Sequence, residues 1–145
     1  MRNIGLIVVG VDGSDTSRAA LRWAHDEAAN HGALLTVVMA WHPPPLPQIP
    51  PYGSLPPEDY VDQPRRDALA LLDGLTASLA ATTSGVDVRT VVDEGNPAKV
   101  LIEHSAGADL VVVGSRGHGG FAGMLLGSVS HHLVAHSKCP VVVVR

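Results

Sequence analysis

The sequence predicts one α/β domain in which helices cover both faces of a parallel sheet. Along its 145 residues, five short runs of aliphatic and β-branched residues alternate with four segments of helical periodicity. Most of these runs are almost continuously apolar, which is typical of strands buried on both faces of a parallel sheet. Because parallel strands need crossovers and helical crossovers are right-handed, the alternation predicts a doubly wound open sandwich.

The five apolar runs are the expected strands of this sheet. They are Ile4–Val11, Leu34–Trp41, Val86–Val92, Leu110–Gly114 and Val141–Val144. The third run alternates between apolar and polar residues, a pattern that suits a strand with one face in water. We therefore expect the third strand at an edge of the sheet.

Apolar side chains that recur every three or four residues predict the four helices. The first is expected from Asp15 or Thr16 to His31. Ser14 or Asp15 suits its N-cap, because a short polar side chain accepts a hydrogen bond from the first turn. The other three helices are expected around Ala68–Leu79, from Pro97 onward, and from about Gly127 to His136.

A proline-rich segment at residues 43–64 interrupts the alternation between the second strand and the second helix. It holds nine of the eleven prolines of the chain, and proline removes backbone donors and disfavours regular structure. The segment is therefore expected as a long loop inserted in a domain that spans residues 1–145. It is either a passive connector or a flap over the carboxyl edge of the sheet, where α/β proteins bind ligands.

Composition argues against several classes of protein. Hydrophobic residues make up 46% of the chain and charged residues 17%, a balance that predicts a folded domain. The net charge of −4 disfavours nucleic-acid binding, which needs clustered lysine and arginine. A single cysteine, Cys139, rules out an internal disulfide and a four-cysteine zinc site. Without a signal-peptide pattern or an apolar run of about 20 residues, we expect a cytoplasmic protein with no membrane partner.

Six glycines gather between residues 114 and 127, after the fourth expected strand and before the fourth expected helix. Glycines allow a tight turn in which successive N–H groups point at phosphate oxygens, and the following helix adds its positive N-terminal end. Ser128 and Ser130 supply hydroxyl donors. The segment matches neither the Walker A loop nor the dinucleotide-binding fingerprint. A flexible loop without a ligand is the alternative.

Asp12 follows the first expected strand, at the edge of a parallel sheet where ligands bind. Its carboxylate is suited to accept hydrogen bonds from ribose hydroxyls. The alternative is a capping role at the next helix, for which Ser14 and Asp15 are also candidates.

The glycine segment has a defined spacing, Gly-x2-Gly-x9-Gly-Ser, formed by Gly114, Gly117, Gly127 and Ser128. Five further stretches accompany it, namely Val8–Ser14, Glu94–Ala98, Ala108–Gly117, Leu126–Ser130 and Cys139–Val144. Together they resemble the universal stress protein family, whose nucleotide-binding members share this spacing. The resemblance spans nearly the whole chain and covers residues 43–64 least.

The resemblance implies a five-stranded parallel sheet in the strand order 3-2-1-4-5, with ATP as the ligand. The winding direction then reverses between strands one and four, so that Asp12 and the glycine segment flank one crevice. By the same resemblance, Asp12 would meet the ribose or the adenine. Ala40 would contact the adenine edge through its backbone, and Gly114 would lie near the ribose. Val11 and Met39 would form apolar walls.

The resemblance assigns the phosphates mainly to backbone N–H groups. The residues concerned are Gly117, Gly127, Ser128, Val129 and Ser130. Arg116 and His118 lie in the same segment, where each either adds positive charge or points into the solvent. No lysine lies between residues 114 and 130. A polyphosphate would therefore need Mg²⁺ bound by phosphate oxygens and water, and we expect no protein side chain as a metal ligand.

The preferred interpretation is a protein that binds ATP and acts in stress response as an adenylate sensor or a regulatory partner-binding module. Members of the family commonly dimerise through the last strand, so the resemblance implies a homodimer through Val141–Val144, an apolar edge. The alternatives are a slow ATPase without identifiable catalytic residues, a cAMP binder, and a dimeric scaffold or chaperone-like protein that binds no nucleotide. An adenylating enzyme is disfavoured, because Val11–Ser14 stands where such folds carry Ser-Gly-Gly-x-Asp-Ser.

Two further candidates carry less weight. His131, His132 and His136 cluster in the last expected helix, either as an exposed titrating face or with His132 and His136 as a metal-binding pair. Cys139 is expected to be a small buried residue rather than a redox switch.

Overall fold

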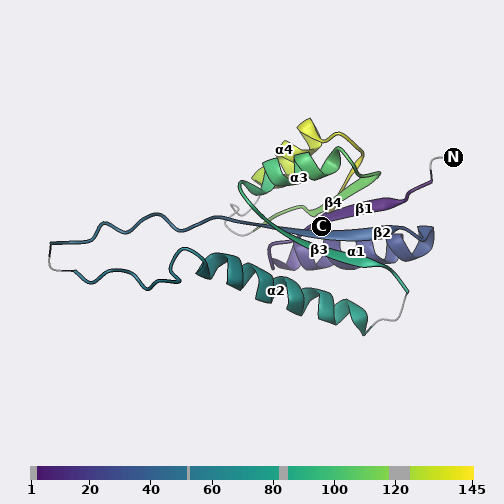
Figure 1. The fold of residues 1–145 in the computed structure, drawn as a ribbon. Helices are drawn as coiled ribbons and strands as arrows, with labels where there is room; N and C mark the ends of the chain where they lie inside the picture. Colours follow the sequence, from purple (N-terminus) through teal and green to yellow (C-terminus); the bar gives the residue numbers. More distant parts are fainter. Residues whose placement is uncertain (1–2, 52, 82–84, 118–124) are drawn as a thin grey trace.

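The strands of the sheet follow the order β3-β2-β1-β4-β5 and all run parallel (Figure 1). This computed structural model describes residues 3–51, 53–81, 85–117 and 125–145. The strands are β1 (Leu6–Gly10), β2 (Leu34–Trp41), β3 (Val88–Glu94), β4 (Leu110–Gly114) and β5 (Val141–Val144). The predicted doubly wound sheet, the strand order implied by the resemblance and the edge position of the third strand are confirmed.

Four helices connect the strands, namely α1 (Asp15–His31), α2 (Gln63–Ala80), α3 (Pro97–Ser105) and α4 (Ser128–His136). The helix α2 begins inside the segment that was expected as a loop, because Pro64 stands in its first turn. Proline costs no hydrogen bond there, since an N–H in the first turn has no partner within the helix. None of the helices in the described ranges is long and apolar enough to cross a membrane.

Two strands differ from the expected bounds. The strand β3 begins and ends two residues later than expected, because it pairs with β2 up to Trp41, which lies opposite Glu94. The strand β1 is shorter than the apolar run Ile4–Val11. Its register continues past its end, however, since the Val11 N–H donates to the Val38 carbonyl (3.0 Å).

Alternate side chains of the strands fill two separate apolar layers. On one face of the sheet, Val9 packs in a cluster with Leu21 of α1 and Leu72 of α2. On the other face, Val38 packs in a cluster that includes Leu133 of α4. Successive residues of a strand point to opposite faces, so both sets must be apolar. This explains why the strands appear in the sequence as continuous apolar runs.

The proline-rich segment forms a long extended arm between the end of β2 and the start of α2 (Figure 1). The Gly53 N–H donates to the Pro50 carbonyl (2.8 Å), and the Tyr60 hydroxyl donates to the Pro45 carbonyl (3.3 Å). Leu46 is 82% exposed, as expected for a segment that packs little on the domain. In Figure 1 the arm points away from the body of the domain.

Gly114 ends β4 at a point where α1 passes very close. A Cβ atom at this position would lie 2.6 Å from Thr16 Oγ1 and 2.7 Å from the Thr16 carbonyl carbon. Backbone atoms of a packed helix cannot yield as a flexible side chain does. We therefore predict that Gly114→Ala lowers the free energy of unfolding by about 2 kcal/mol, measured by urea denaturation.

Gly74 is the matched control for this prediction. It lies on the exposed side of α2, and an added Cβ would meet nothing within 4 Å. Alanine is a better helix former than glycine, so Gly74→Ala is expected to raise the free energy of unfolding by about 0.5–1 kcal/mol. Equal unfolding midpoints for the two variants would contradict the close packing at Gly114.

Candidate functional site

A cavity of about 520 Å³ opens at the carboxyl ends of β1, β2 and β4. Its wall combines the residues after β1 and β4 with the first turns of α3 and α4. The winding of the sheet reverses between β1 and β4, because α1 and α2 cover one face while α3 and α4 cover the other. Such a switch point is where open α/β sheets bind ligands.

The cavity brings together ten of the twelve residues expected at the site. They are Val11, Asp12, Ala40, Gly114, Arg116, Gly117, Gly127, Ser128, Val129 and Ser130. Met39 is not on the wall, and His118 lies outside the described residues. No described residue of the segment 43–64 lines the cavity.

Met39 was expected as an apolar wall, and this requires correction. The strand β2 presents Val38 and Ala40 to the cavity, whereas Met39 is buried in the layer under α1 and α2. The cause is the two-residue period of a strand, which sends neighbouring side chains to opposite faces. Val38 is therefore the apolar side chain that β2 contributes.

Asp12 is held against the wall by the start of α1. Its Oδ1 accepts hydrogen bonds from the N–H (2.9 Å) and the hydroxyl (2.5 Å) of Ser14. Its own N–H donates to Ser17 Oγ (3.3 Å). The N-cap of α1 is Ser14, whose Oγ accepts from the Ser17 N–H. The first turn of α1 is thus capped by Ser14, while Asp12 presents its carboxylate to the cavity.

The two ends of the glycine segment are tied together at the cavity wall. The Gly127 N–H donates to the Ser115 carbonyl (2.6 Å), and the Thr16 hydroxyl donates to the Arg116 carbonyl. The buried Ser130 hydroxyl lies within hydrogen-bond distance of the Ser115 (3.2 Å) and Gly127 (3.0 Å) carbonyls. The Ser130 hydroxyl therefore serves the loop, which leaves its backbone N–H as the group suited to a ligand.

Among the three helices whose first turns line the cavity, α4 differs in how its N-terminus is capped. Ser14 caps α1, and the Asn96 side chain caps α3 by accepting from the N–H groups of Ala98 and Lys99. The N-cap of α4 is Gly127, which has no side chain to accept from the first turn. The first N–H groups of α4 and its positive end therefore face the cavity, as in many anion sites.

The first turns of α3 were missed as part of the wall. Asn96, Pro97, Ala98, Val100 and Leu101 all line the cavity. The sequence carried a usable signal, because an asparagine cap followed by proline at the first helical position marks a helix that begins at a strand end. In a parallel sheet that helix starts at the carboxyl edge, where α/β proteins bind ligands.

Few charged groups line the cavity. In the described part of the chain, Asp12 and Arg116 are its ionised side chains, and His132 is a titratable one. Across the same ranges, no group of three or more His, Cys, Asp or Glu residues is arranged to hold a metal ion. Main-chain groups and apolar side chains make up most of the remaining wall.

Cys139 lies apart from the cavity, at the entrance to β5. It is partly buried, and this burial raises the pKa of its thiol, although the hydrogen bond with the Ser137 hydroxyl acts in the opposite direction. The thiol is therefore protonated at neutral pH. A reactive cysteine has the opposite property, a lowered pKa.

Comparison with known proteins gives a consistent picture. The model of the universal stress protein family matches residues 4–145. A universal stress protein of Mycobacterium tuberculosis is 38% identical over 146 residues, which cover 96% of this chain and 45% of the relative. The chain thus spans about half the length of the mycobacterial relatives it matches.

Two further matches cover nearly the whole length of both chains. A universal stress protein of Thermus aquaticus is 33% identical over 141 residues, covering 96% of this chain and 97% of the relative. A crystal structure of a universal stress protein in complex with cAMP is 30% identical, with a TM-score of 0.70. That match covers 99% of this chain and 98% of the other.

Proposed function

The chain belongs to the universal stress protein family, and on this premise we propose that its cavity binds an adenine nucleotide, with ATP as the preferred ligand. One observation carries the proposal. The Asp12 carboxylate lies on the wall of the same cavity as the N-terminus of α4, whose N-cap residue, Gly127, has no side chain to cap the first turn. The first group suits ribose hydroxyls and the second suits phosphates.

In this proposal the nucleoside lies over the ends of β1 and β2. Val38 and Ala40 offer an apolar surface to the base, with Val11 and Asp12 beside it. A carboxylate fixed by two hydrogen bonds is suited to accept from ribose hydroxyls without rearrangement. Gly114 completes this end of the wall.

The phosphates lie at the other end, over the glycine segment and α4. The N–H groups of Gly117 and of residues 127–130 are the proposed donors. The Arg116 side chain is exposed and lines the cavity, where it can add positive charge. Backbone donors at a helix start favour anions without any lysine.

We propose a role in stress response as an adenylate sensor or a regulatory partner-binding module. The ligand in the relative solved with cAMP makes that nucleotide the second candidate. A cyclic phosphate carries one negative charge, whereas ATP carries about four. The two candidates are therefore distinguished by how binding depends on cations.

The first test compares nucleotides and a substitution at Gly117. A Cβ at Gly117 would lie 2.6 Å from Asp12 Oδ2, so a larger side chain would displace the carboxylate and fill the phosphate end. Isothermal titration with ATP, ADP, AMP and cAMP should give affinities that Gly117→Val lowers at least about tenfold, the loss of one charge-assisted contact. Product analysis after incubation shows whether bound ATP is hydrolysed.

The control for this test is Gly107→Val. Gly107 is exposed, lies away from the cavity, and has nothing within 4 Å of an added Cβ. Its replacement should leave nucleotide affinity unchanged. If no nucleotide binds to the unaltered protein, the proposed function falls and the nucleotide-independent scaffold is favoured.

The second test concerns Mg²⁺. Arg116 is the one permanently positive side chain on the wall in the described ranges, too little for a tetra-anion. We therefore expect Mg²⁺ bound mainly by phosphate oxygens and water to accompany ATP. Titration in EDTA should weaken ATP binding about tenfold or more, and cAMP binding far less. Equal ATP affinity with and without the ion would contradict the proposal.

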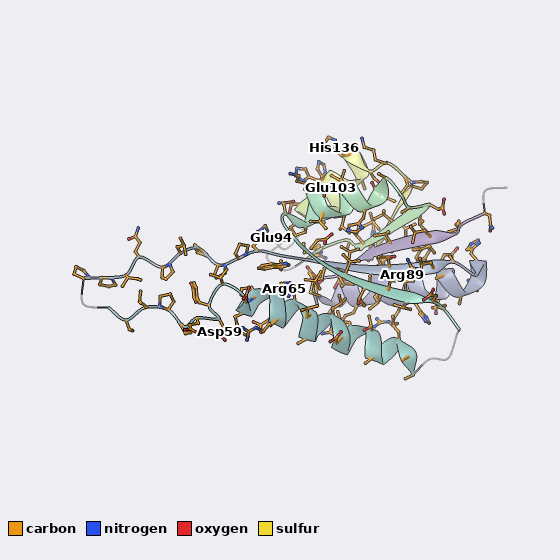
Figure 2. The ribbon with its side chains drawn as sticks, viewed as in Figure 1. Asp59, Arg65, Arg89, Glu94, Glu103 and His136 are labelled. Atoms are coloured by element: carbon orange, nitrogen blue, oxygen red, sulfur yellow. The ribbon has the colours of Figure 1, made fainter. Side chains whose placement is uncertain are left out.

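We also propose a homodimer through β5. The other edge strand, β3, carries Arg89 and Glu94 (Figure 2), and charges of this kind discourage edge-to-edge pairing. In contrast, the four residues of β5 are all valines and all half-buried. An unpaired apolar edge of this kind favours pairing with a second copy of the chain.

Light scattering tests the proposed dimer. Val142→Lys places a charge in the middle of β5 and should shift the protein from dimer to monomer. Thr90→Lys, at an exposed position in the middle of the opposite edge strand, is the matched control and should not change the mass. A Val142→Lys protein that stays dimeric would place the interface elsewhere.

A further inference from the structure

His132 lies on the cavity wall with its ring held by its own helix. Its Nδ1 is 2.8 Å from the Ser128 carbonyl oxygen, one turn earlier in α4. A carbonyl oxygen only accepts hydrogen bonds, so Nδ1 must carry the hydrogen. In the neutral ring, Nε2 is then the nitrogen with a lone pair, and it is the nitrogen left to meet a ligand.

With this tautomer, Nε2 of His132 interacts with a phosphate in opposite ways in the neutral and the protonated ring. The neutral ring offers Nε2 as an acceptor, which repels a phosphate oxygen. The protonated ring offers an N–H donor together with a positive charge, which attracts it. Histidine side chains change between these forms in the range between pH 5 and 8.

We propose that His132 is a specificity-determining residue of the cavity, whose protonated ring contacts the phosphates and favours nucleotides with several negative charges. Affinity for ATP then rises as the pH falls from 8 to 6, while affinity for cAMP changes less. This inference rests on the proposed function, since it assumes that phosphates lie over the start of α4.

The charge balance of the cavity makes such an effect large. Asp12 contributes one negative charge and Arg116 one positive charge in the described part of the wall. With a neutral His132 these two charges offset each other. A proton on His132 gives the wall a net positive charge, and a polyphosphate gains from it in proportion to its own charge.

Titratable and charged groups lie on α4 itself and on the helix α3 that packs against it. On α4 itself, His131 packs edge-on and His136 packs nearly parallel, each with ring centroids 6.4 Å away. The helix α3, which packs against α4, carries Lys99, Glu103 and His104, while β5 carries only valines. Figure 2 shows Glu103 on α3 and His136 on α4.

A bound polyphosphate would bring several negative charges beside the His132 ring, and nearby negative charge favours the protonated imidazole. Binding of ATP near neutral pH should therefore take up a proton at His132, which cAMP does to a smaller extent.

Titration calorimetry with Mg²⁺ present tests this on the full chain. ATP and cAMP are titrated at pH 6.0 and 8.0 into the unaltered protein, His132→Gln and the control His131→Gln. His131 is exposed and does not line the cavity. We expect ATP affinity to rise about tenfold from pH 8.0 to 6.0 in the unaltered protein and in His131→Gln, and less than about threefold in His132→Gln.

Buffers of different ionisation enthalpy supply a second readout, the number of protons taken up on binding. Titration of the nucleotide's own phosphates is common to all three proteins, so the difference between them reports His132. Equal pH dependence in His132→Gln, or equal proton uptake, would overturn the inference while leaving nucleotide binding intact. If neither ATP nor cAMP binds at either pH, the proposed function fails and the inference fails with it.

Discussion

The close approach of two helices to the ends of neighbouring strands is the constraint on which the cavity depends. A Cβ at Gly10 would lie 2.6 Å from Leu101 Cδ1 of α3, and one at Gly114 would meet the backbone of α1. Glycine at the ends of β1 and β4 therefore lets α1 and α3 pack tightly on opposite faces. The first turns of α1 and α3 thereby reach the edge of the sheet where the cavity lies.

The hydroxyl groups around the cavity have a structural use that determines what is left for a ligand. Ser14 holds the Asp12 carboxylate, Thr16 holds the Arg116 carbonyl, and Ser130 holds the Ser115 carbonyl. Each of them fixes one side of the wall. These bonds also hold the nearby backbone N–H groups, which are suited to an anion, in place before any ligand arrives. A preorganised site of this kind avoids the entropy cost of ordering a loop on binding.

Some features of the site were predictable from the sequence, and others were not, for physical reasons. The strands were predictable because burial on both faces demands continuous apolar runs. For the same reason the sequence did not show which side chains of β2 point to which face of the sheet. Val38 and Met39 are both apolar, and the pattern does not say which one faces the cavity. Prolines in residues 43–64 predicted an irregular segment, but composition carries no information about its direction. The wall formed by α3 was missed because its apolar residues were used only to predict a helix, and helical periodicity does not say what its first turns face.

The negative charge of the whole chain is compatible with an anionic ligand because the forces that bind it act at short range. The net charge of −4 is spread over the surface and screened over about 8 Å at physiological salt. The donors of α4 act within its first turn, where the helix dipole is felt most. In the described part of the wall, Asp12 and Arg116 offset each other, so one added positive charge changes the balance substantially. In the proposed function that charge comes from a metal ion on the phosphates or from a proton on His132. Nucleotide binding would then depend on the charge of the ligand and on the conditions, as the proposed sensor role requires, whereas a wall of lysines would bind polyphosphates under all conditions.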